Sequence, residues 1–147
     1  MKKFKFSLEK ILQLKNQFLK SLKNDLGILQ IQLREKENEI NELKIKYKTT
    51  EEIYKIKSSS SILPYEIKQY KDFLNSILNR IKKEEETKNL IIKKIEAKKQ
   101  EIIDMNIEIS SIEKLKEKKL VRYNYEVQKM EEILIEEFVS SIDNVQH

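Results

Sequence analysis

The chain has 147 residues, of which 37% are charged, and it contains one glycine, one proline and no cysteine. This composition excludes disulfides and thiolate sites, and it leaves little to interrupt a helix. No stretch approaches the ~18 uncharged apolar residues that a membrane-spanning helix needs, and the basic N-terminus lacks the apolar core of a cleaved signal peptide.

The net charge of +5 is unevenly distributed along the chain. Residues 1–23 carry seven lysines and one glutamate, a net +6, whereas residues 126–143 carry six acids and one lysine, a net −5. Nucleic-acid-binding proteins usually keep a basic stripe without a matching acidic block. The bipolar pattern favours docking to charged protein surfaces, where charge mainly steers the encounter.

The first predicted element is a helix over about residues 7–57. Ser7 is its expected N-cap, with Phe6 and Ile11 at the staple positions on either side. Gly27 lies inside the helix at a cost of about 1 kcal/mol relative to alanine, and we interpret it as an outward-facing position rather than a hinge. An apolar residue recurs every seven positions along this helix, with further leucines between, which predicts a coiled-coil seam: Leu12, Leu19, Leu26, Leu33, Ile40, Tyr47 and Tyr54, then Leu8, Leu22, Leu29 and Leu43.

Residues 58–63 form the predicted turn. Four serines, Ser58 to Ser61, precede Ile62, Leu63 and Pro64. The proline pushes the residue before it out of the helical region and itself suits the first turn of a new helix. A second helix should therefore begin at residue 64.

This second helix is expected to run to about residue 140, with residues 141–147 frayed. Its own seam follows the heptad spacing at Ile67, Leu74, Ile81, Ile95, Ile102 and Ile109. The predicted fold class is therefore all-α: two long antiparallel helices forming one coiled-coil hairpin over residues 1–147, with the second helix longer than the first.

The second helix should overhang the first. About a turn near residue 60, residue i faces roughly residue 121 − i, so nothing in the chain would cover the part beyond about Lys118. We expect this overhang to be a binding surface, with self-association or local instability as the alternatives. Its apolar stripe follows spacings of three and four: Leu120, Tyr123, Val127, Met130, Leu134 and Phe138.

Three charged residues interrupt the seam: Lys36, Glu84 and Lys88. The relation by which residue i faces residue 121 − i places Lys36 near Glu84 or Glu85. We interpret such contacts as fixing the register of the two helices, which is the best-attested use of polar groups in coiled coils.

The sequence offers no catalytic constellation, and we expect neither an enzyme nor a metal or cofactor. The single histidine, His147, is the last residue, and the only glycine lies in a helix where it cannot cradle a phosphate. Carboxylates in Glu84-Glu85-Glu86 point around the helix instead of converging on one ion. Lys114 to Lys119 is a short basic run with interleaved acids, which is typical of a solvated helix face.

Several segments resemble flagellar FliJ proteins. The opening Phe4-x-Phe6-x-Leu8-x-x-Ile11-Leu12 resembles the start of that family. The stretch from Ile112 to Leu120, followed by Tyr123, Glu126 and Met130-Glu131-Glu132, resembles its tail. The length and the position of the turn also fit, so the resemblance spans the whole chain.

The resemblance implies an antiparallel two-helix coiled coil that serves type III flagellar protein export in the cytoplasm. It implies a general export chaperone, similar in shape to the central stalk of rotary ATPases, that links the hexameric export ATPase to the membrane export gate. Other export chaperones are further candidate partners. Contact with the membrane would be only peripheral, through the gate. The gate contact would fall on Tyr70, Phe73 and Ile77, with Arg80 and Glu84 on the same face. The ATPase contact would fall on the end with both termini, through the stripe Leu120, Tyr123, Val127, Met130, Leu134 and Phe138.

Two other classes of function remain open from the sequence. One is a structural or self-associating coiled-coil spacer. The other is a basic helical hairpin that binds nucleic acid, whose binding would fall steeply with salt.

Overall fold

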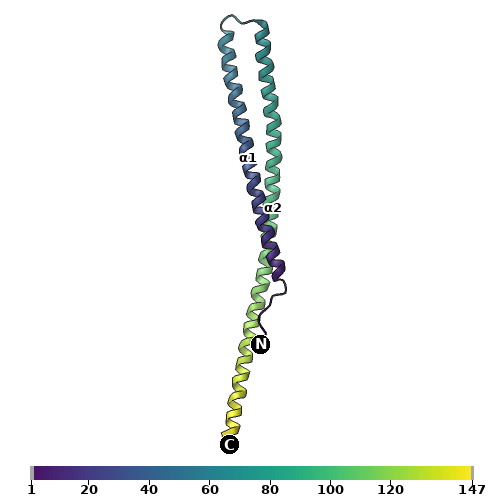
Figure 1. Cartoon of the computed structure of the whole chain (residues 1–147), viewed down its shortest axis with the longest axis vertical. Helices are drawn as coiled ribbons and strands as arrows, with labels where there is room; N and C mark the ends of the chain where they lie inside the picture. The colour runs from purple at the N-terminus through teal and green to yellow at the C-terminus, as the bar shows by residue number, and fades with distance from the viewer. Residues whose placement is uncertain (1, 147) are drawn as a thin grey trace. The chain divides into compact units, whose positions relative to one another are not determined.

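A computed structural model describes residues 2–146, with side chains described up to Val145. It contains two helices, α1 (Glu9–Ser58, 50 residues) and α2 (Pro64–Gln146, 83 residues). The two helices pack against each other in antiparallel directions, and the second is the longer (Figure 1). The predicted helical hairpin is confirmed.

Packing divides the chain into two compact units, Ser21–Ile102 and Met1–Lys20 with Ile103–His147. Both helices contribute to both units. In the first, the part of α1 from residue 21 lies beside the start of α2, and the turn joins them (Figure 1). In the second, the N-terminal part of the chain lies along the later part of α2.

The core is a single apolar seam in each unit. Every residue expected in the seam is buried or half-buried, from Leu8, just before α1, to Tyr54 in α1, and from Ile67 to Ile109 in α2. Two packed helices cannot surround a large side chain on all sides, so no large side chain among the described residues is less than 2% exposed. The most buried side chains are Phe6, Leu12, Leu22, Ile40, Ile77, Ile95 and Ile109.

The start of α1 differs from the prediction, because Ser7 is not the N-cap. The Glu9 N–H donates to the Phe6 carbonyl in a tight turn, and the first helical bond runs from the Leu12 N–H to the Leu8 carbonyl. Leu8 therefore occupies the cap position. Phe6 is only 8% exposed, and this anchor against α2 explains why the helix begins two residues later than expected.

The serine turn satisfies the end of α1. The hydroxyls of Ser58, Ser59 and Ser60 donate to carbonyls of the last turn at 2.7, 2.7 and 3.1 Å. The acceptors are the carbonyls of Tyr54, Ile56 and Lys57, and the Lys57 carbonyl also accepts from the Ser60 N–H, so the serines add hydrogen bonds where the regular pattern of the helix ends. The Leu63 carbonyl then accepts from the N–H groups of Glu66 and Ile67 and starts α2.

The end of α2 also differs from the prediction. The helix continues to Gln146 instead of ending near residue 140. No glycine or proline follows Pro64, and Ile142 and Val145 prolong the apolar spacing, so nothing in the sequence stops the helix there. His147 lies outside the described residues.

Candidate interaction surfaces

Among residues 2–146, no group of three or more histidine, cysteine or acidic side chains is placed to hold a metal ion. Neither helix has, over the same residues, a stretch long and apolar enough to cross a membrane. The candidate sites are therefore surfaces that could contact other molecules.

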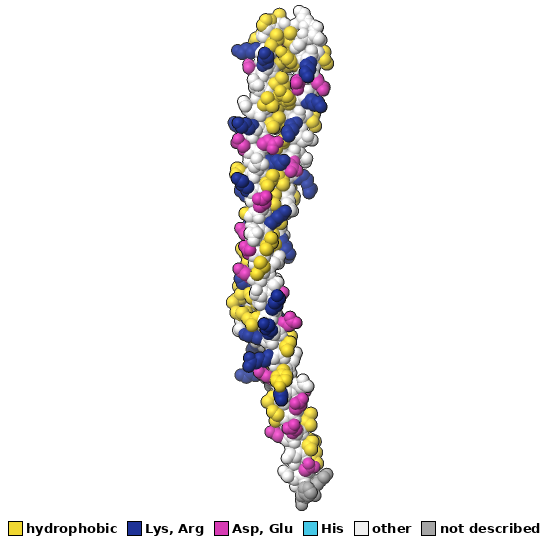
Figure 2. Space-filling view, turned by 180° about the vertical axis from the view of Figure 1, so that it is seen from behind, with side chains coloured by type: hydrophobic (Ala, Val, Ile, Leu, Met, Phe, Trp, Pro, Cys, Tyr) yellow, Lys and Arg dark blue, Asp and Glu magenta, His cyan; other side chains and the backbone are white. Residues whose placement is uncertain are grey.

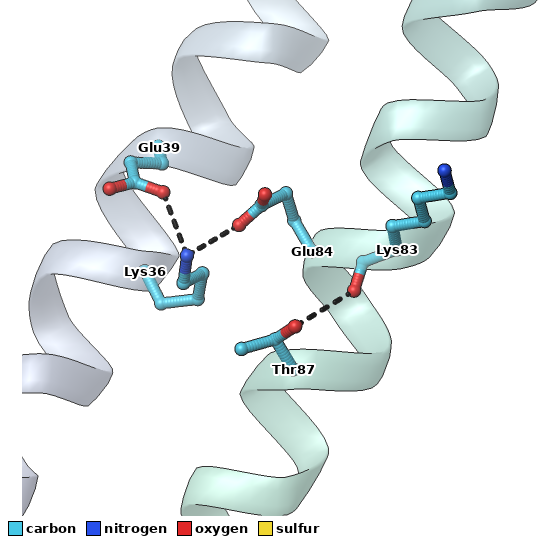
Figure 3. A network of polar contacts seen from close by, with 5 residues as sticks. All are labelled: Lys36, Glu39, Lys83, Glu84 and Thr87. Atoms are coloured by element: carbon cyan, nitrogen blue, oxygen red, sulfur yellow. Dashed lines mark hydrogen bonds and ion pairs between the residues drawn. The ribbon is translucent and has the colours of Figure 1, made fainter.

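The polar interruption of the seam forms a small network in the middle of the hairpin (Figure 3). Lys36 Nζ lies 2.5 Å from Glu84 Oε2 and 3.0 Å from Glu39 Oε2, which confirms the predicted contact between Lys36 and Glu84. Glu85, the alternative partner, pairs instead with Lys44 at 3.5 Å. The third interrupting residue, Lys88, lies 3.9 Å from Glu37 on the opposite helix.

The Lys36–Glu84 pair is half-buried, with side chains 21% and 23% exposed. Its hydrogen bond lowers the pKa of Glu84, and the same bond, followed by that to Glu39, raises the pKa of Lys36. Each group therefore favours the charged form of the other.

Near the turn, aromatic side chains of both helices come together. The rings of Tyr54 and Tyr70 lie 5.6 Å apart, and the Lys57 ammonium stands 5.5 Å from the centre of the Tyr70 ring. The Tyr70 hydroxyl raises the pKa of Lys57. Phe73 is 41% exposed, with Lys46 Nζ 5.4 Å from its ring centre. An open groove of about 510 Å³ runs past Tyr70 and Phe73.

The three residues expected at the gate contact thus have different environments. Phe73 is exposed and Tyr70 is half-buried, but Ile77 is only 4% exposed and belongs to the hairpin core. Tyr65, just after the turn, is 70% exposed. Tyr65, Tyr70 and Phe73 are thus the exposed or half-buried aromatic side chains at the start of α2, and we call these three residues the turn-end surface.

At the other end, the chain covers more of α2 than predicted. The Tyr123 hydroxyl donates to the Lys2 carbonyl at 2.7 Å, and the rings of Tyr123 and Phe4 lie 5.5 Å apart. Lys119 Nζ stands 5.7 Å from the centre of the Phe6 ring. The prediction that nothing covers α2 beyond about Lys118 is therefore wrong.

The expectation that residue i faces residue 121 − i is wrong here because the two parts of the chain pair in a different register. Lys15 Nζ lies 2.6 Å from Glu108 Oε2, although that relation placed residue 106 opposite it. Lys116 pairs with Glu9 at 2.7 Å, where the relation placed residue 112. Contacts in this unit are shifted by up to about one helical turn, and the non-helical residues 2–8 extend the cover further along α2.

The uncovered part of α2 is residues 124–146, which we call the C-terminal segment. Figure 1 shows it continuing without a neighbouring chain, and every side chain described from Gln128 to Val145 is exposed. Of the expected stripe, Met130, Leu134 and Phe138 are 50, 60 and 65% exposed, while Val127 is half-buried. Leu120, which precedes this segment, is 39% exposed.

This segment is apolar on more than one face. Four further apolar residues, which are not among the six of the expected stripe, are 40–62% exposed: Ile133, Ile135, Val139 and Ile142. Ile142 continues the stripe four residues after Phe138, whereas Ile135 and Val139 lie on another face. Acids and apolar side chains alternate on the view in Figure 2, and from Met130 to Gln146 there are five acids and no lysine or arginine. Sequence reasoning missed these four residues because it followed one stripe only as far as Phe138. Their density within ten residues was the available signal.

Comparison with known proteins gives one match. A family model described as "Flagellar FliJ protein" matches residues 4–142, nearly the whole chain. No curated protein and no solved structure matches.

Proposed function

Since this chain belongs to the FliJ family of flagellar export components, we propose that it is a non-enzymatic accessory protein of flagellar type III export. In this role it links the hexameric export ATPase to the membrane export gate. It works in the cytoplasm, peripherally at the inner face of the membrane, and assists export chaperones.

One observation carries the proposal: the C-terminal segment is a helix with many exposed apolar side chains and no cover from its own chain. A helix that is apolar on several faces is normally enclosed by other protein. A partner that surrounds or caps a helix end, as a ring-shaped ATPase would, accounts for this composition better than a flat surface would.

Two double variants test the ATPase contact. Leu134→Ser with Phe138→Ser changes the predicted stripe, and Ile135→Ser with Val139→Ser changes another face of the same turns. All four side chains are 50–65% exposed, so neither variant should disturb the hairpin. Each is co-purified with the export ATPase, and circular dichroism checks that the helix is retained.

The pattern of loss distinguishes the two modes of docking. If both double variants lose ATPase binding, the segment enters the ring. If only Leu134→Ser with Phe138→Ser loses ATPase binding, the segment caps the ring. Full binding by both variants would reject the contact. Truncation after Lys118 is a poorer test, because it would also remove Tyr123, which holds residues 2–4.

The gate contact is proposed for the turn-end surface. Tyr65→Ala with Phe73→Ala should weaken binding to the gate while sparing the ATPase. Leu90→Ala is the matched control, because Leu90 is 59% exposed on the same helix but lies far from the turn. Gate binding that survives the double variant would place the contact elsewhere.

A further inference from the structure

A basic groove of about 790 Å³ lies where residues 2–5 pass beside α2. Five cationic side chains line it: Lys2, Lys3, Lys5, Lys119 and Arg122. Phe4 and Tyr123 form its apolar wall, fixed by their ring contact and by the hydrogen bond from Tyr123 to the Lys2 carbonyl. Glu126 also lines the groove and pairs with Arg122 at 3.5 Å, which leaves four lysines and no further acid in the lining.

The same face of α2 continues from the groove into the C-terminal segment. Positions 119, 122, 126, 130, 133 and 137 recur every three or four residues, which places them on one side of the helix. The face begins with the cations Lys119 and Arg122, continues with Glu126, which pairs with Arg122, and ends with the acid Glu137. Between them, Met130 and Ile133 are 50% and 47% exposed. The charge therefore reverses along a single face.

From this reversal we infer that a second copy of the chain occupies the groove, with the two α2 helices antiparallel and centred near residue 128. In this register Lys119 of one copy lies level with Glu137 of the other. Tyr123 and Phe4 receive Ile133, and Glu126 lies close to Lys129. Because the arrangement is two-fold symmetric, every such contact is made twice.

Other arrangements of two copies bring like charges together. A parallel pair in register sets Lys119 beside Lys119 and Glu137 beside Glu137. An antiparallel pair centred further along α2 brings together the two acidic stretches, each with five acids between residues 131 and 143. Of these three arrangements, the antiparallel overlap centred near residue 128 is the one that offsets the charge at both ends.

The association should be weak and sensitive to salt. Its ion pairs are exposed, and exposed pairs contribute little each and are screened within a Debye length of about 8 Å at physiological ionic strength. The apolar contact is limited to a few side chains from each copy. A reversible dimer that forms at high concentration and low salt is therefore expected.

This inference goes beyond the proposed function and does not need it to be correct. Met130 lies both on the face that would meet a second copy and on the stripe proposed for the ATPase. The two partners would therefore compete, and self-association would hold free chains in a form that cannot dock.

Charge exchange tests the antiparallel register. The mass of the full chain, 17.7 kDa as a monomer, is followed by sedimentation equilibrium at low salt over a range of concentrations. Lys119→Glu and Glu137→Lys should each lower the dimer fraction at least several-fold. An equimolar mixture of the two variants should restore it, because both inter-copy pairs then join opposite charges. Lys114→Glu and Glu132→Lys carry the same charge changes off the shared face and should leave the dimer intact.

The outcomes are distinguishable from those of the ATPase test. A mass that remains at 17.7 kDa at every concentration, or a mixture that does not recover, overturns the inference whether or not the ATPase binds. Dimerisation that responds to Lys119 and Glu137 supports it even if ATPase binding fails. Circular dichroism excludes loss of helix as the reason for a lower mass.

Discussion

At the scale of single residues, the Lys36–Glu84 pair shows what a polar interruption can do in a thin core. Neither side chain is fully buried, so each retains some water and the desolvation cost stays modest. The pair places one charge of α1 opposite one charge of α2, and a slip of the helices would separate them. Its main contribution is therefore expected to be register.

Changing Glu84 to Gln tests the energetic side of this pair. The folded-state pKa of Glu84 lies below its ordinary value of 4.5, so its stabilisation is present above that pH and is lost as the pH falls through the folded pKa. Glu84→Gln should unfold at a lower urea concentration than the native chain at pH 7, and this difference in urea midpoint should shrink as the pH falls below 4.5 and the Glu84 carboxylate of the native chain is protonated. Glu85→Gln, which breaks the more exposed pair with Lys44, should lower the urea midpoint by less. A difference that widens on acidification would contradict the assignment.

Phe73 and Ile77 differ in a way that sequence spacing cannot reveal. They lie one turn apart on α2, and the resemblance led us to expect both at the gate contact. The structure places Ile77 in the core and Phe73 at the surface, because a helix in a two-helix hairpin buries only one narrow stripe. A residue within that stripe is not available to a partner while the hairpin stays closed.

Alanine substitutions should separate the two roles. Ile77→Ala should cost about 2–3 kcal/mol of unfolding free energy, since it removes a side chain that is 4% exposed. Phe73→Ala should cost about 1 kcal/mol or less because that ring is already 41% exposed. Urea denaturation measures both. Equal losses would mean that the two side chains share one environment.

At the scale of the elements, Gly27 is the weakest position of α1. A Cβ built there meets no atom within 4 Å, which agrees with the interpretation of a tolerant, outward-facing position. Gly27→Ala should raise the unfolding free energy by about 0.5–1 kcal/mol, because alanine loses less backbone entropy in a helix. The measurement is the urea midpoint. Destabilisation would instead indicate that the glycine serves a bend or a close approach.

The two helices themselves could be predicted from the sequence, but their ends could not. Heptad spacing and the Ser58–Pro64 stretch were sufficient for the hairpin, since both are local signals. Ser7 has the right chemistry for a cap, yet burial of Phe6 against α2 decided where α1 begins. Packing between distant segments, which a local pattern does not contain, also set the register of Lys15 and Lys116.

At the scale of the whole molecule, α2 combines two tasks. Up to Tyr123 the residues of its apolar seam hold the chain together, whereas every side chain described from Gln128 onward is exposed. The sequence predicted this division but placed it several residues too early, because it could not foresee that residues 2–8 fold back onto α2 without forming helix. The candidate surfaces at the two ends were thus anticipated as regions, and less well as individual residues.

The division predicts that folding and docking can be separated by truncation. A chain that ends after Gln128 keeps Tyr123 and its contacts with Lys2 and Phe4, and it loses only side chains that are already exposed. Its unfolding free energy should therefore remain within about 0.5 kcal/mol of the full chain, while co-purification with the export ATPase is lost. A marked loss of stability would mean that the C-terminal segment supports the hairpin. Its exposed apolar residues would then need an explanation within the chain instead of in a partner.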